Sequence, residues 1–203
     1  MVESAESVLS FWVDTVGIEH WYMSTPEIDR EITDRFMVTY EAARDGNLDS
    51  WQDDARGSLA LLLLLDQFPR NMFRDDPRSF ATDPMARAVA RAAIECGQDK
   101  DIDGLVRQFF YLPFEHSEDL ADQEYGYQKF LSAMPELALG LLHARAHHEI
   151  IRIFGRFPFR NKVLARTSTP KEEEFMEKGG YMAFVDDLEQ REKATAGPEL
   201  THG

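Results

Sequence analysis

The sequence predicts an all-α fold, built either as a bundle or as a stack of antiparallel helical hairpins. Three observations support this prediction. Apolar residues recur at helical spacing along most of the chain, as in the series from Ile28 through Ile32 and Phe36 to Tyr40. Residues typical of helix starts and helix stops separate these segments. No run of alternating β-branched residues bounded by turn pairs indicates a strand.

The segment Ser58–Arg74 contains the helix around which the others are expected to pack. The five residues from Leu61 to Leu65 are all leucine, and a helix that is apolar on every side is normally buried on every side. We expect this helix to begin near Asp53 and to end before Pro69, because a residue that precedes proline is disfavoured in helical geometry.

Most of the remaining helices are placed by their capping residues. In chain order they are Glu3–Val13, Pro26 to Gly46, Asp83 to Gly97, Asp103 to Pro113, Glu118–Leu131 after a Ser117 cap, Glu136–Phe154 closed by Gly155, and Pro170 to Gly179. Together they predict one helical domain over residues 1–185. Residues 186–203 are expected to form a polar, disordered tail.

Composition and charge exclude several classes of protein. The chain has 203 residues, with 22 basic and 37 acidic side chains and a formal net charge of −15. This balance argues against nucleic acid and against an anionic membrane surface as partners. The acidic N-terminal stretch does not resemble a signal peptide, and the leucine run is too short to span a bilayer. With Cys96 as its one cysteine, the chain is expected in the reducing cytoplasm. We expect Cys96 to be a small core residue.

The first candidate site is rich in arginine, and its motif occurs twice. The stretch from Asp66 to Asn71 reads DQFPRN, and the stretch from Gly155 to Asn161 reads GRFPFRN. Both follow an apolar helix and place Arg-Asn after Phe-Pro at its end. The polar members are Asp66, Gln67, Arg70, Asn71, Arg74, Arg156, Arg160 and Asn161. If the two helix ends meet, guanidinium and amide groups could bind a small anion. Alternatively, these side chains satisfy the unpaired carbonyls at the helix ends.

The second candidate site is acidic. Glu115, His116, Glu118 and Asp119 lie within the segment that runs from Pro113 to Glu124. Carboxylates and an imidazole can hold a divalent metal or transfer protons near neutral pH. The alternative is that acids at a helix N-terminus offset the helix dipole or neutralise the arginines.

The third candidate site consists of His143 and His147, which are one helical turn apart, the spacing of paired metal ligands. Ile150, Ile151 and Phe154 continue the same face, which favours hydrogen-bonded core histidines instead. We expect that His147 orients one of the carboxylates of the acidic segment.

Three segments in order resemble the bacterial family known as domain of unknown function 924. They are LLLLLDQFPRNMFRDDPRSFATDP from Leu61, YLPFEHSEDLADQE from Tyr111, and GRFPFRNKVLARTSTPKEEEF from Gly155. The resemblance spans nearly the whole chain and implies a helical fold similar to tetratricopeptide-repeat superhelices, with no established activity. One departure concerns the third motif, in which the family has a histidine where this chain has Phe159. The family pattern includes His147 but not His143.

The sequence therefore predicts a cytoplasmic helical protein that binds a small anionic ligand or a peptide where the three motifs converge. Arg70, Asn71, Arg74, Arg160 and Asn161 would hold the anionic group, and Glu115, His116 and Asp119 would provide acceptors or transfer a proton. No glycine-rich phosphate loop or nucleophile motif is present, and no cofactor is expected.

Two alternatives to this function remain open. One is a metal-assisted hydrolase that uses Glu115, His116, Glu118 and His147. The other is a scaffolding protein in which the polar motifs form an internal network. The sequence does not indicate an oligomeric state.

Overall fold

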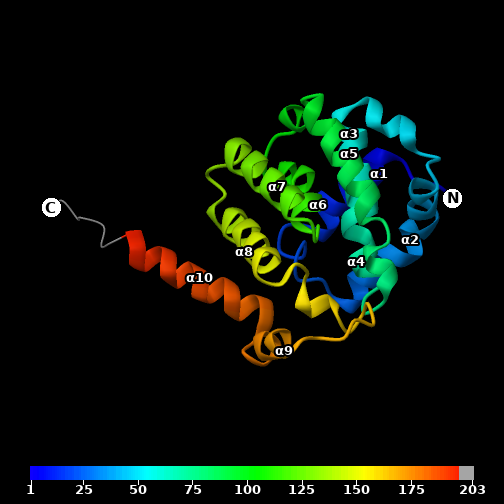
Figure 1. The fold of residues 1–203 in the computed structure, drawn as a ribbon. Helices are drawn as coiled ribbons and strands as arrows, with labels where there is room; N and C mark the ends of the chain where they lie inside the picture. Colours follow the sequence, from blue (N-terminus) through cyan, green and yellow to red (C-terminus); the bar gives the residue numbers. More distant parts are fainter. Residues whose placement is uncertain (197–203) are drawn as a thin grey trace. The chain divides into compact units, whose positions relative to one another are not determined.

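The structure, a computed structural model, describes residues 1–196 (Figure 1). Within that range every regular element is a helix, which confirms the all-α prediction. Contacts divide the chain into two compact units, of which the first is Met1–Phe114 and the second begins at Glu115. We describe each unit by itself. The stacking of hairpins into a superhelix or bundle, and the single domain over residues 1–185, stay predictions.

The first unit contains the α-helices α1 to α5, which are joined by shorter helical segments. The α-helices are α1 (Ala5–Ser10), α2 (Pro26–Arg44), α3 (Ala55–Leu62), α4 (Phe68–Met72) and α5 (Asp83–Glu95). Wider π-helical segments follow α1 at Phe11–Val16 and follow α3 at Leu63–Gln67, and 3-10 turns fill Asp49–Asp53, Pro77–Phe80, Gln98–Asp101 and Leu105–Phe110. The helix expected between Asp103 and Pro113 is thus a 3-10 segment followed by the short α6 (Leu112–Glu115).

The leucine run forms the centre of the first unit's core, as predicted. None of the residues Leu61 to Leu65 is more than 2% exposed. Aromatic rings pack beside it, with the centroid of Phe36 lying 5.0 Å from the centroids of both Phe11 and Phe68. Such close ring packing adds to the stability that apolar burial provides.

The prediction that Pro69 ends the central helix is wrong. Helical geometry continues from α3 through the π-helical turn into α4, with Pro69 near the start of α4. Proline lacks the N–H that would bond to the carbonyl of Leu65 four residues earlier. In the structure the hydroxyl of Thr82 donates to that carbonyl at 2.6 Å. The wide turn and this external donor together allow the helix to pass through the proline.

The second unit consists mainly of α7 (Leu120–Ala133), α8 (Ala138–Phe154), α9 (Pro170–Glu177) and α10 (Gly180–Ala196). Helices α7 and α8 lie side by side (Figure 1). Leu142, Ala146 and Val185 form one apolar cluster, and a second cluster contains Ile150, Ile151 and Phe157. α8 ends at Gly155, as predicted, because Gly155 adopts a left-handed conformation with φ of 70°.

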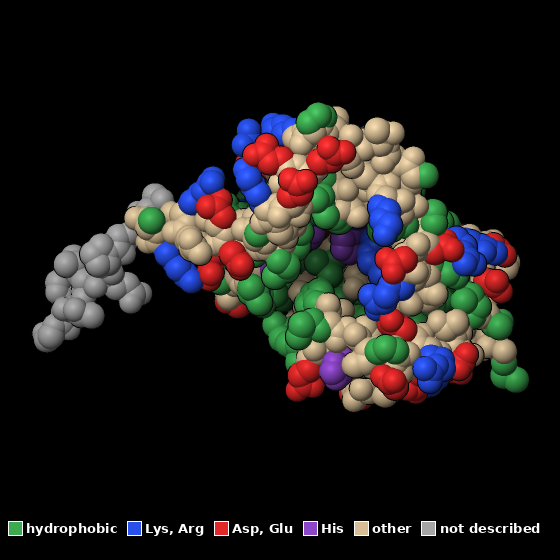
Figure 2. Space-filling model, turned by 90° about the horizontal axis from the view of Figure 1, so that it is seen from below, with side chains coloured by type: hydrophobic (Ala, Val, Ile, Leu, Met, Phe, Trp, Pro, Cys, Tyr) green, Lys and Arg blue, Asp and Glu red, His purple; other side chains and the backbone are tan. Residues whose placement is uncertain are grey.

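Helix α10 changes the expected boundary of the tail. Its residues run past Asp186 to Ala196, so the described part of the predicted tail is helical, and residues 197–203 lie outside the described part. Leu188 packs against the cluster of Leu142, Ala146 and Val185. Basic and acidic side chains alternate along the segment that leads to the grey residues in Figure 2, and ion pairs such as Arg191–Asp187 stabilise it.

Two smaller expectations also differ from the structure. Asp119, not Ser117, caps α7, because its carboxylate accepts the N–H groups of Ala121 and Asp122. Cys96 is exposed, since it lies at the C-terminal cap of α5.

Among the described residues, no helix has the length and apolar character that crossing a membrane requires.

Candidate functional site

In the first unit, Arg70 belongs to a largely buried network of ion pairs. Its guanidinium donates to Asp66 at 3.2 Å, to Asp83 at 3.0 Å and to the carbonyl of Ser79 at 2.6 Å. Gln67 donates to the other oxygen of Asp66 at 2.5 Å. Burial alone would lower the pKa of Arg70, but Asp66 and Asp83 outweigh it and raise the pKa. These contacts tie α4 to the start of α5.

Asn71 and Arg74 have a different partner. Both donate to Asp29 of α2, the Asn71 amide at 2.8 Å and the Arg74 guanidinium at 2.8 and 2.9 Å. The side chain of Arg74 is 55% exposed, whereas that of Asp29 is 19% exposed. The pair therefore joins α4 to α2 at the edge of the first unit.

In the second unit, Arg156 is held by Glu172 at the start of α9. Two parallel hydrogen bonds of 2.6 and 2.8 Å join the guanidinium to the carboxylate. Glu172 also completes a capping box with Thr169. The bonds from Arg156, followed by those from Thr169, place the pKa of Glu172 far below its usual value despite burial.

Glu118 and Asn161 share a partner, Arg166, which the sequence analysis did not single out. Arg166 donates two bonds of 2.6 and 2.9 Å to Glu118 and one of 3.0 Å to the Asn161 oxygen. Glu118 also accepts the N–H of Phe157 at 2.8 Å. Burial would raise the pKa of Glu118, but the bonds from Arg166 and Phe157 lower it overall. The two halves of this contact come from the second and third motifs.

His147 of α8 lies beside the buried carboxylate of Glu115, with its Nδ1 atom 3.4 Å from Oε2. Glu115 is 2% exposed, and the amide of Gln123 fixes its backbone by donating to its carbonyl oxygen at 2.7 Å. The structure thus brings together the acidic segment and the histidine that we expected to orient it. Because Nδ1 faces the carboxylate, the other ring nitrogen, Nε2, is directed away from it.

Tyr181 of α10 connects His147 to a second histidine. Its ring stacks on His147 at a centroid distance of 4.8 Å and on His143 at 5.8 Å. The Nδ1 atom of His143 lies 2.7 Å from the Tyr181 hydroxyl. Burial, with a smaller effect from His147, lowers the pKa of His143. His116 approaches the same region, with its ring 6.2 Å from His147.

Phe157 and Phe159 complete this region from the segment after α8. The ring centroids of Phe157 and His147 lie 5.5 Å apart. The guanidinium carbon of Arg160 lies over the ring of Phe157, 4.5 Å from its centroid. Phe159 stacks on Phe157 and touches Tyr181. We define the His147 cluster as these residues of the second unit: Glu115, His116, His143, His147, Phe157, Phe159, Arg160 and Tyr181.

The metal site that the sequence suggested is not assembled. Among the residues that the structure describes, no group of three histidine, cysteine, aspartate or glutamate side chains is arranged to hold a metal ion. Glu118 pairs with Arg166, while Glu115 pairs with His147. The proposed ligands are thus divided between two separate contacts.

The structure places the predicted site residues in both units. Most of the arginines and amides pair with carboxylates inside their own unit, and Asp119 serves as a helix cap. Arg70 belongs to the first unit and Arg160 to the second, so their convergence on one pocket stays a prediction. Sequence reasoning missed Tyr181 and Arg166. Arg166 lies within a quoted motif, but no pattern distinguishes Tyr181, which follows a Gly-Gly pair.

The two repeated motifs also differ in conformation. The first continues a helix through Pro69, whereas in the second Gly155 ends α8 and a short 3-10 turn covers Pro158–Arg160. The similarity of sequence therefore does not produce two similar helix ends.

Comparison with known proteins gives a family but no activity. The chain is similar to a solved structure of a protein of unknown function from Agrobacterium tumefaciens, with 42% identity and a TM-score of 0.81 over 86% of this chain and 97% of that one. No curated protein matches the sequence. The model of a family described as bacterial protein of unknown function, DUF924, matches residues 8–180. The chain therefore belongs to the DUF924 family.

Proposed function

We propose that this protein binds a small organic anion at the His147 cluster of its second unit. The main observation in support of this proposal is that three imidazoles, a guanidinium and three other aromatic rings lie within one network of contacts. Such a set offers hydrogen-bond donors, one permanent positive charge and flat apolar surfaces, which together suit a carboxylate or phosphate attached to an organic body.

Several features support this location over the other arginine-rich positions. Arg70, Arg74, Arg156 and Arg166 are each engaged by carboxylates in their own units. Those contacts are typical of an internal network that stabilises the fold. The His147 cluster also contains a carboxylate, that of Glu115, but it combines this group with three imidazoles and a guanidinium, and the side chain of His147 is 16% exposed.

The Glu115–His147 contact gives the site its orientation. A carboxylate at Nδ1 restricts the rotation of the imidazole and selects which nitrogen faces a ligand. Tyr181 and Phe157 hold the ring from two sides, since one stacks on it and the other meets it edge-on. His147 would therefore present Nε2 to the ligand in a fixed direction, while Arg160 would supply the charge.

A thermal-shift screen against mono- and dicarboxylates and phosphate monoesters tests this proposal, with titration calorimetry on any hit. His147→Gln and Arg160→Gln should abolish the ligand-dependent rise in melting temperature. His148→Gln is the matched control, because His148 is adjacent on α8, is 22% exposed, and pairs with Glu124 and Glu149 instead. The control should keep the rise. If no anion raises the melting temperature, or if folded His147→Gln responds as the unmodified protein does, the proposal is wrong.

A further inference from the structure

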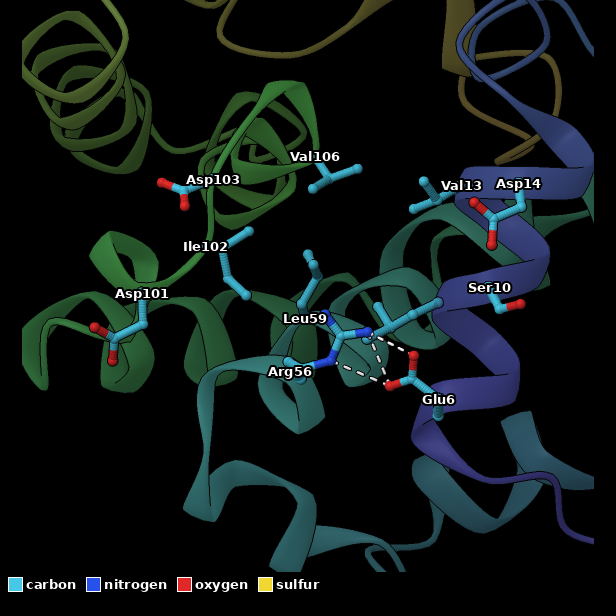
Figure 3. Close-up of a pocket in the computed structure, with 11 residues that line it drawn as sticks. Glu6, Ser10, Val13, Asp14, Arg56, Leu59, Asp101, Ile102, Asp103 and Val106 are labelled. Carbon is cyan, nitrogen blue, oxygen red and sulfur yellow. Dashed lines mark hydrogen bonds and ion pairs between the residues drawn. The ribbon is translucent and has the colours of Figure 1, made fainter.

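The first unit contains a cleft of about 410 Å³ that the proposed anion site does not involve. It lies between the α1 segment and the stretch that contains Asp101 and Val106 (Figure 3). Its volume falls within the range of small-molecule sites in proteins. Because the cleft and the His147 cluster lie in different units, the two inferences stand or fall separately.

The floor of the cleft is apolar. It is formed by five aliphatic side chains, namely Leu9, Val13, Leu59, Ile102 and Val106. In Figure 3, Ile102, Val106, Leu59 and Val13 occupy the middle of the view. Val13 is 39% exposed, so part of this floor faces solvent. An aliphatic chain laid along it would remove apolar surface from water, which is favourable.

The charge around this floor is negative. Glu6 and Arg56 neutralise each other through an ion pair of 2.7 Å. Asp14, Asp101 and Asp103 also line the cleft, and within the described part of the chain no ion pair or hydrogen bond engages their carboxylates. The charge that these three side chains add to the cleft is therefore uncompensated.

The arrangement of the carboxylates selects the kind of cation. Asp101 and Asp103 lie on one side of the cleft and Asp14 on the other, with the aliphatic side chains between them (Figure 3). These acids are not among any group that could hold a metal ion, within the residues described. Charges separated by an apolar strip are complementary to a chain with ammonium groups at its ends. They are not complementary to a point charge.

We propose that this cleft binds an aliphatic amine that carries two or more ammonium groups. The methylene chain would cover Val13, Ile102 and Val106. One ammonium group would approach Asp101 and Asp103, and the other would approach Asp14. The apolar floor provides the contact area, and the carboxylates determine the sign of the ligand's charge.

Titration calorimetry of the full chain with 1,5-diaminopentane and with spermidine, at 150 mM salt to screen diffuse attraction, tests this proposal. The neutral probe 1,5-pentanediol has the same chain and should not bind. Asp101→Asn with Asp103→Asn should weaken diamine binding by roughly fivefold or more. Val13→Arg, which places a cation in the cleft at a partly exposed position, should prevent binding.

The matched control replaces two exposed acids of the other unit, Glu173→Gln with Glu177→Gln, and changes the net charge by the same amount. It should bind the diamine as the unmodified protein does. Three outcomes would each overturn the proposal. They are no binding of either amine, equal binding of the diol, and equal weakening in the control, which would indicate attraction to the net charge of −15 alone.

Discussion

At the scale of single residues, burial distinguishes ion pairs that look equivalent in the sequence. Arg70 and Arg74 belong to one motif, and each donates to aspartate. The carboxylates that hold Arg70 are deeply buried, with Asp66 at 1% and Asp83 at 7% exposure. The side chain of Arg74 is 55% exposed. Removing one member of an ion pair strongly lowers the free energy of unfolding only where the other member is left as an unpaired charge inside the protein.

We therefore expect Arg70→Ala to lower the free energy of unfolding by roughly 3 kcal/mol, because it removes the cation beside two buried carboxylates. Arg74→Ala should cost less than about 1 kcal/mol, as exposed pairs usually do. Urea denaturation followed by circular dichroism measures both values. Equal losses in the two variants would contradict the assignment of Arg70 to a structural network.

The pair of Arg156 and Glu172 should make stability depend on pH. The pKa of Glu172 is lowered in the folded state, so its contribution is complete above the usual glutamate value of 4.5 and declines as the pH falls below it. Glu172→Gln should lower the melting temperature by roughly 5 °C at pH 7. The difference in melting temperature between this variant and the unmodified protein should become smaller as the pH falls from 4.5 to 3. Glu173→Gln, at an exposed neighbouring position, is the control and should show neither effect.

At the scale of elements, the closeness of α7 and α8 depends on a residue without a side chain. A Cβ atom at Gly140 would lie 2.6 Å from the ring of Phe130, which is fully buried. The backbone of α8 can thus approach α7 only because this position is glycine. The sequence pattern gives no sign of this requirement, since glycine inside a helix usually lowers its stability.

Gly140→Ala should therefore destabilise the protein by about 1–3 kcal/mol, although alanine is the better helix former. Phe130→Leu would make room for the added methyl group, so the double variant should lose less than the sum of the two single losses. A double-mutant cycle by chemical denaturation measures this difference. Strictly additive losses would show that the two residues do not contact one another.

At the scale of the whole molecule, acidic side chains determine behaviour in solution. A net charge of −15 keeps molecules apart through mutual repulsion. We expect solubility to be lowest near the calculated isoelectric point of 4.8, where that repulsion vanishes. Light scattering across pH 4 to 8 should show a maximum near that value. A maximum near neutral pH would instead indicate association driven by apolar surface.

Helical periodicity, caps and the leucine run were enough to predict the fold class and most helix ends. What they could not predict depends on groups distant in sequence. Pro69 does not end its helix, because Thr82 supplies the donor that the proline lacks. Likewise, the position of His147 beside Glu115 was expected, but its stacking on Tyr181 was not, since that ring comes from a helix that the sequence pattern did not reveal.

The π-helical turn at Leu63–Gln67 has a consequence for how the chain tolerates insertions and deletions. A turn of this kind accommodates one residue more than a regular helical turn, so the helix behaves as if it had already absorbed an insertion. Deleting one leucine would therefore convert the wide turn into a regular one and leave the residues that follow facing as before, so that Arg70 would still reach Asp83 and Arg74 would still reach Asp29. Deleting two leucines would rotate those residues by about 100°. The leucine run can thus lose one residue, but not two, without redirecting the polar motif.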